Sequence, residues 1–279
     1  MVGKPSRDLA LVNTDASMKT LFKPLQWIYC IYALLTFIAI MFLVVPFVVL
    51  ALFFGRIKGG NFIYKLVKAW GYLWYLFVGM RHENIYEAPH DPRRQFIFVA
   101  NHISYMDIPP VVMALSQPVR VLAKYEMSRI PVFGFIYKSA TVLVDRRSPE
   151  KRAESIREMK IFISRRISIF IFPEGTFNET GAPLKEFYDG AFRIAIETAT
   201  PIKPVLFLDT VDRLHFSSIF TLTPGRCRVV FLEEVAVDGL TLENLPALKK
   251  QVFDVMDAGL RRYRKYPANG SDGRSFPKA

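Results

Sequence analysis

Six short apolar runs, separated by stretches with helical character, limit what this chain can fold into. Most of the runs are continuous rather than alternating, which is typical of strands that are covered on both faces. The runs lie at residues 96–100, 119–123, 141–144, 168–172, 202–208 and 227–232, and the helical stretches lie near 108–116, 149–164, 189–198 and 245–265. This alternation predicts an α/β fold with a mixed central sheet flanked by helices.

A second constraint is a run of 32 residues without a charge, from Pro24 to Gly55. The apolar core of a signal peptide spans about 7–15 residues before a small-residue cleavage site, so this longer run is expected to be retained. As one helix it would measure about 48 Å, well over a hydrocarbon core of ~30 Å. Pro46 predicts a break within it. We therefore expect an N-terminal membrane-associating helical segment ahead of the α/β fold.

Cations flank both ends of this run, and they are Lys19, Lys23, Arg56, Lys58, Lys65 and Lys68. Positive charge on both sides favours a re-entrant or monotopic hairpin with both ends at the cytoplasmic face, and a tilted single span is the alternative. The aromatic-rich stretch 62–80 suits either the lipid interface or a helix buried against the next domain. We place the domain that follows on the cytoplasmic face of a membrane.

Composition sets the domain limits and narrows the partners. We expect a membrane-associating segment at 1–80, an α/β domain at 81–266 and a flexible tail at 267–279. The two cysteines, Cys30 and Cys227, have neither disulfide nor zinc spacing, and no metal site is expected. The net charge of +12 accompanies apolar segments rather than a nucleic-acid signature. An anionic phospholipid surface is therefore the expected partner, and nucleic acid is not.

The most informative motif is Asn-His-Ile-Ser-Tyr-Met-Asp at residues 101–107, directly after the apolar run 96–100. Pro109 and Pro110 indicate a helix start just beyond Asp107. An Asp in that position accepts amide hydrogen bonds and can reach back to His102. A histidine held by a carboxylate can take a proton from a hydroxyl with its other nitrogen. With no Gly-x-Ser-x-Gly elbow present, a substrate alcohol would have to attack directly.

A second motif, Phe-Pro-Glu-Gly-Thr at residues 172–176, also ends a buried run. Gly175 permits close backbone approach, and Glu174 is either an acceptor for ligand hydroxyls or a structural residue that binds backbone amides. Two polar loops at strand ends suggest one cleft. Lys124 ends another run and faces either that cleft or solvent. Arg146 follows the run 141–144 and offers a planar fork for phosphate, unless it is simply solvated.

Four elements in order resemble the glycerol-phosphate and lysophosphatidate acyltransferase family over roughly residues 96–208. They are the His102…Asp107 box, the stretch from Lys124 through Val144-Asp145-Arg146, the Phe-Pro-Glu-Gly-Thr motif, and Thr-Pro-Ile-Lys-Pro-Val at 200–205. The resemblance implies acyl transfer from a thioester on coenzyme A or acyl carrier protein to the free hydroxyl of a lysophospholipid, without a cofactor. Lysophosphatidate is the simplest acceptor.

The resemblance also implies roles for individual residues. His102 would be the general base and Asp107 its partner. The substrate-binding residues would be Arg146, Glu174, Gly175, Thr176, Lys124 and Asn101. Phe177 and Tyr188 stand where family members often carry cations, so an acceptor without a phosphate, such as an aminoacyl lysolipid, stays open. A non-catalytic lipid-binding protein of the same fold is the third reading, against which the presence of His102, Asp107 and Glu174 counts.

Overall fold

The computed structural model describes residues 7–145 and 148–266. Its centre is a seven-stranded sheet with the order β1-β7-β6-β2-β5-β3-β4. The strands are β1 (Met80–Tyr86), β2 (Ile97–Ala100), β3 (Val119–Lys124), β4 (Thr141–Val144), β5 (Ser168–Ile171), β6 (Ile202–Phe207) and β7 (Gly225–Phe231). All neighbouring strands are parallel except β6 and β7, which run antiparallel. The predicted mixed sheet is confirmed.

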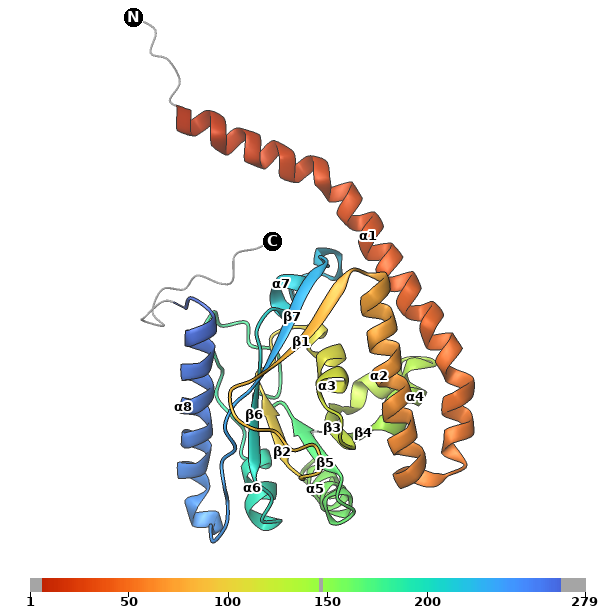
Figure 1. Cartoon of the computed structure of the whole chain (residues 1–279), viewed down its shortest axis with the longest axis vertical. Helices are drawn as coiled ribbons and strands as arrows, with labels where there is room; N and C mark the ends of the chain where they lie inside the picture. Colours follow the sequence, from red (N-terminus) through yellow and green to blue (C-terminus); the bar gives the residue numbers. More distant parts are fainter. Residues whose placement is uncertain (1–6, 146–147, 267–279) are drawn as a thin grey trace, which may run out of the picture.

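Helices cover both faces of this sheet (Figure 1). One face carries α1 (Arg7–Leu52), α2 (Gly60–Phe77), α3 (Ile108–Ala114) and α4 (Phe133–Ala140), and the other carries α5 (Pro149–Ser164), α6 (Gly190–Glu197) and α8 (Leu245–Tyr263). The short α7 (Thr210–Arg213) follows β6. The shorter helical turns are η1 (Gly55–Gly59), η2 (Tyr105–Asp107), η3 (Tyr125–Arg129), η4 (Ile219–Thr221) and η5 (Leu242–Asn244).

The central strands are apolar along their whole length because each of their faces meets a different hydrophobic core. Phe98 and Phe170 contribute to the core beneath α2, whereas their neighbours Val99 and Ile169 contribute to the core beneath α6 and α8. Successive strand residues point to opposite faces, so a strand covered on both sides needs apolar residues at every position. All four side chains are at most 1% exposed.

The expected break at Pro46 is wrong. Helix α1 contains both Pro24 and Pro46 and ends only at Leu52, where the chain turns and leads through η1 into α2. A proline removes one backbone hydrogen bond and bends a helix, but an apolar helix with packing neighbours tolerates it. Figure 1 shows α1 curving along α2, and its first turns run beyond the body of the molecule. The helical hairpin is therefore formed by α1 and α2 together.

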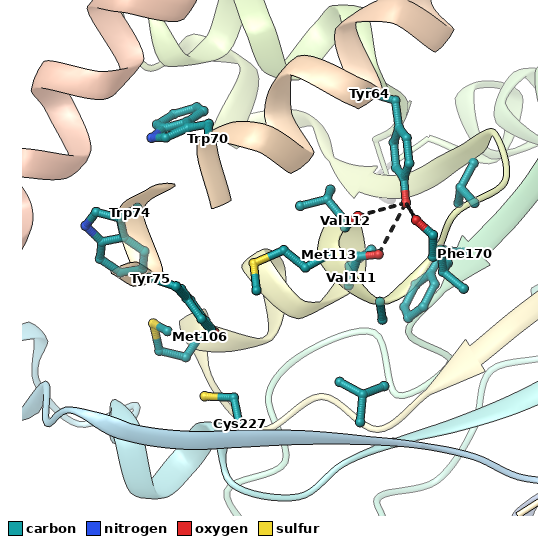
Figure 2. Close-up of a cluster of buried hydrophobic side chains, with 14 of the residues drawn as sticks. Tyr64, Trp70, Trp74, Tyr75, Met106, Val111, Val112, Met113, Phe170 and Cys227 are labelled. Carbon is teal, nitrogen blue, oxygen red and sulfur yellow. Dashed lines mark hydrogen bonds between the residues drawn. The ribbon is translucent and has the colours of Figure 1, made fainter. Parts of the chain in front are cut away.

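Helix α2 packs on the sheet rather than standing apart from it. Its buried aromatic residues are Tyr64, Trp70, Trp74 and Tyr75, spaced so that they share one helix face. Figure 2 shows this face meeting Met106, Met113 and Phe170 from the layer below. Of the two locations expected for this aromatic-rich stretch, these four residues occupy the second, because they are buried against the α/β domain. The domain boundary at residue 80 stays a prediction, and the core crosses it. The tail at 267–279 lies outside the described residues.

Two elements are absent from the strands and helices predicted from the sequence. β1 reads Met-Arg-His-Glu-Asn-Ile-Tyr and forms an edge strand that pairs only with β7, so most of its side chains are partly exposed. α4 is a helix of eight residues whose buried positions are Gly134 and Ile136. Edge strands and short surface helices bury too little to show a hydrophobic period.

Candidate functional site

The candidate site residues converge because their strands are neighbours in the sheet. β2, β5, β3 and β4 are adjacent and parallel, so the loops that follow them meet at one edge. These loops carry His102, Glu174, Lys124 and Asp145 respectively. Ligands in such sheets bind at the carboxyl ends of the strands. Arg146, the next residue in the sequence after Asp145, lies outside the described residues.

His102 and Asp107 form the predicted dyad. His102 Nδ1 lies 2.7 Å from Asp107 Oδ2, and the same oxygen accepts the backbone N–H groups of Ile103 at 2.8 Å and Ser104 at 2.9 Å. Asp107 is fully buried, whereas 17% of the His102 side chain is exposed. The Asp107 carboxylate thus accepts hydrogen bonds from residues that precede it in the sequence, and it makes no capping hydrogen bond at the start of α3. The arrangement fixes the imidazole through Nδ1 and leaves Nε2 for a substrate.

Glu174 connects the two motifs. Its Oε1 accepts the backbone N–H of His102 at 2.8 Å, and its Oε2 accepts the backbone N–H of Lys185 at 2.9 Å. The His102 carbonyl in turn accepts the N–H of Asn178 at 2.7 Å. Glu174 is fully buried, so it holds loops in place instead of presenting its carboxylate to a ligand. Its structural alternative thus fits the geometry, with partners in two other segments rather than in its own turn.

Aromatic rings enclose the imidazole of His102. The Phe172 ring stacks on it with centroids 4.0 Å apart, and the Phe177 ring meets it edge-on at 4.4 Å. Tyr105 packs edge-on against Phe177 at 4.7 Å and is 53% exposed. Rings on both sides restrict rotation of the imidazole and reduce its contact with water. The sequence analysis did not assign these roles; aromatic residues on both sides of Pro-Glu-Gly-Thr were the signal available.

Asn101 does not face a ligand. Its Oδ1 accepts the backbone N–H of Phe207 at 2.8 Å, and its Nδ2 donates to the Phe207 carbonyl at 2.9 Å. The side chain is fully buried, so this residue braces the end of β2 against β6. Ser104, another residue that sequence reasoning passed over, donates through Oγ to the Leu214 carbonyl at 2.5 Å. These contacts fix the backbone on either side of His102.

The remaining predicted binding residues lie on the exposed rim. Lys124 is exposed at the end of β3. Thr176 is exposed, and its Oγ1 lies 2.6 Å from Lys185 Nζ, which places a cation next to the second motif. Gly175 has φ of 75°, a left-handed conformation that favours glycine. Lys124, at the end of β3, is thus an exposed cation at this edge of the sheet, and Lys185, on the loop that follows β5, is a partly exposed one.

Burial makes the side chain of Glu174 a weaker acid than an ordinary glutamate. Desolvation raises its pKa from 4.5 to about 8, against the lowering effect of the N–H groups of His102 and Lys185. The nearby Asp107 carboxylate adds to the rise. The folded protein thus retains a proton that the unfolded chain releases above its ordinary pKa. The contribution of Glu174 to stability is complete below pH 4.5 and is lost as the pH rises toward about 8.

Glu174→Gln is expected to remove this pH dependence. The wild-type protein should exceed the variant in melting temperature by more at pH 5 than at pH 8. The variant should be the less stable protein at low pH, because its amide NH₂ faces a backbone N–H and leaves it unpaired, a cost of about 1–3 kcal/mol. Thermal unfolding from pH 5 to pH 8 measures both effects. Glu243→Gln, at an exposed position, is the control, and a parallel pH profile for both variants would contradict the assignment.

Comparisons with known proteins agree with this architecture. The family model described as "Acyltransferase" matches residues 80–208, from β1 to the end of β6. The 1-acyl-sn-glycerol-3-phosphate acyltransferase alpha of Mus musculus is 27% identical over 184 residues, which cover 65% of this chain and 63% of that protein. The 1-acyl-sn-glycerol-3-phosphate acyltransferase of Haemophilus influenzae is 25% identical over 222 residues, covering 78% of this chain and 90% of that protein.

A solved structure shares the fold. The 1-acyl-sn-glycerophosphate acyltransferase PlsC of Thermotoga maritima aligns with a TM-score of 0.67 and 25% identity, covering 88% of this chain and all of that one. The matched segment spans less than two thirds of the mouse protein, at 63%. The family match includes both motifs and the strands that position them. Residues 80–208 thus match the acyltransferase family model, and the chain is similar to 1-acyl-sn-glycerol-3-phosphate acyltransferases in sequence and in fold.

Proposed function

We propose that this protein transfers a fatty acyl group from a thioester to the free hydroxyl of a lysophospholipid, with lysophosphatidate as acceptor and phosphatidate as product. The relatives named for that reaction support the choice of acceptor. The observation that carries the proposal is the His102–Asp107 pair, held at 2.7 Å at the open edge of the sheet. The donor carrier is coenzyme A or acyl carrier protein, and no further cofactor takes part.

We infer the path of each proton from this geometry. Asp107 accepts Nδ1–H, so the lone pair of Nε2 is free to take the proton of the acceptor hydroxyl. The hydroxyl oxygen attacks the thioester carbonyl as its O–H bond breaks, and the carbonyl π electrons move to oxygen. Collapse of the tetrahedral intermediate breaks the C–S bond. The imidazolium of His102 then gives its proton to the leaving thiolate, which regenerates the base.

His102→Ala should abolish acyl transfer, and Asp107→Asn should lower it steeply. Loss of a positioned general base costs about 10²–10⁴-fold in rate. The asparagine amide would also face the N–H groups of Ile103 and Ser104, which now donate to Asp107. Transfer of labelled acyl groups to lysophosphatidate, from either carrier, is the assay.

His90→Gln serves as the matched control, since His90 precedes β2 at the opposite edge of the sheet and contacts Gln117. This variant should retain wild-type activity. A folded His102→Ala protein that keeps more than half of the wild-type rate would overturn the base assignment. Wild-type protein that transfers no acyl group to any lysolipid would favour a non-catalytic lipid-binding role.

Arg146→Ala tests whether the acceptor carries a phosphate. Phe177, which stands where relatives often have a cation, packs on His102, so Arg146 would supply much of the phosphate binding. Charge-assisted bonds to phosphate are strong, and the substitution should lower kcat/KM for lysophosphatidate at least about tenfold, roughly 1.4 kcal/mol. Donor hydrolysis should change less. Unchanged lysophosphatidate kinetics, together with a wild-type preference for an aminoacyl lysolipid, would replace the phosphate acceptor.

Membrane association is the second part of the proposal. Lys23–Leu52 is a helical segment long and apolar enough to cross a membrane by length and composition, with a mean hydropathy of 2.9 in an 18-residue window. Much of its surface is exposed, including Leu35 at 61% and Leu43 at 66%, and Phe53, just after the helix, is 83% exposed. An apolar face of this size is typical of a membrane or protein contact. We assign it to the bilayer and place the catalytic edge at the cytoplasmic surface.

Flotation with detergent-free vesicles containing anionic phospholipid should bring the full-length protein up with the lipid. The paired substitution Leu35→Asp and Leu43→Asp should reduce the bound fraction at least several-fold, because each charge must then enter an apolar phase. Leu242→Asp is the control: this leucine is also exposed, at 43%, but lies on η5. Wild-type protein that stays at the bottom of the gradient would exclude the membrane assignment.

A further inference from the structure

Among the described residues, only one of the two carboxylate oxygens of Asp107 has hydrogen-bond partners. Its Oδ2 takes three hydrogen bonds, from His102, Ile103 and Ser104. Its Oδ1 is buried and accepts no hydrogen bond from any residue in the ranges 7–145 and 148–266. A buried charged oxygen without a donor is costly, and such atoms usually have a partner in direct or water-bridged contact.

A matching donor comes from α2. The hydroxyl of Tyr75 is buried and also has no hydrogen-bond partner among the described residues, in a side chain that is 2% exposed. Figure 2 shows Tyr75 in the same cluster as Met106, the residue before Asp107, and Cys227. The charge of Asp107 acts on this phenol: burial, then Cys227 and Asp107, raise the pKa of Tyr75 well above 10. Tyr75 is therefore a neutral donor at any pH at which the enzyme would work.

We propose that Tyr75 is a positioning residue for the catalytic dyad, and that its hydroxyl donates to Asp107 Oδ1 directly or through one water molecule. The proposal rests on the proposed role of His102. It adds a residue from α2 to a dyad that otherwise consists of a single loop. Two buried polar groups that each lack a partner then satisfy one another.

The competing acceptor is the Cys227 thiol, which lies beside the Tyr75 hydroxyl but forms no geometrically acceptable hydrogen bond with it. A thiol is a weak acceptor, whereas a carboxylate oxygen is a strong one. Burial raises the pKa of Cys227 to about 11, so its sulfur carries a proton at neutral pH. The carboxylate is the better partner for the phenol on both counts.

Several other charged or titratable groups act on this cluster from the surrounding elements, and any pH readout includes them. They are Asp209 and Arg213 around Cys227, and Glu174 with Lys185 on the side of the second motif. Asp209 is paired with Arg228 at 2.6 Å. None of these groups is altered by a substitution at Tyr75, so a change in His102 titration reports on the Tyr75–Asp107 contact.

Tyr75→Phe removes one oxygen and keeps the ring. Without the donor, more of the negative charge of Asp107 is available to the imidazolium, so His102 should keep its proton to a higher pH in the variant than in the wild-type protein. NMR titration of ¹⁵N-labelled histidine measures this shift without reference to activity. The value of kcat/KM should fall about tenfold, and in an Asp107→Asn background the same change should have no further effect. The melting temperature should fall.

Tyr64→Phe is the matched control, because Tyr64 is also a buried tyrosine of α2 and its hydroxyl donates to the Val112 carbonyl at 3.2 Å (Figure 2). It should lower the melting temperature but leave the His102 titration and kcat/KM unchanged. Cys227→Ala should also leave that titration unchanged.

An unshifted His102 titration with a raised melting temperature in Tyr75→Phe would mean that the hydroxyl was unpaired, and would overturn the proposal. If the wild-type protein shows no transferase activity, the proposed function fails, and the titration still decides the role of Tyr75.

Discussion

Two buried carboxylates hold the site together, and each does so by accepting backbone N–H groups. Asp107 takes those of Ile103 and Ser104, and Glu174 takes those of His102 and Lys185. A loop that leaves a buried strand carries backbone groups that water cannot reach, and these must be paired. The two oxygens of an acidic side chain meet that need by accepting hydrogen bonds from two or more such groups. The same atoms that make the loops rigid also fix the histidine between them.

The site is continuous with the hydrophobic core. Phe170 and Phe172 face the same side of the sheet with rings 5.3 Å apart, and Phe172 stacks on His102. The imidazole thus continues a layer of aromatic side chains that begins beneath α2. An imidazole in this position has little freedom to rotate, so the core would supply part of the preorganisation that the proposed general-base role needs.

Sequence reasoning predicted what local chemistry determines. Continuous apolar runs indicated the buried strands, and the spacing from His102 to Asp107 indicated a contact within one loop. It failed where partners come from distant parts of the chain: Asn101 looked like a binding residue, but it pairs with the backbone of Phe207. Glu174 likewise accepts the backbone N–H of Lys185, a residue that no sequence motif connects to it. Contacts with distant residues also explain two further differences. Strand β1 forms because it pairs with β7, and α1 continues through Pro46 because the helix packs against neighbouring elements.

The arrangement of α1 and α2 gives the N-terminal segment a role beyond attachment. Trp74 donates to the Ala33 carbonyl at 2.8 Å and so joins α2 to α1, while the next residue, Tyr75, is buried in the core beneath the dyad. A helix that contacts both the apolar α1 and the core next to Asp107 is fixed in position by both. Because close-packed interiors deform little, a displacement of α1 relative to the sheet would also shift the residues that pack around Asp107. The segment proposed to meet the lipid is therefore part of the structure that holds the His102–Asp107 pair.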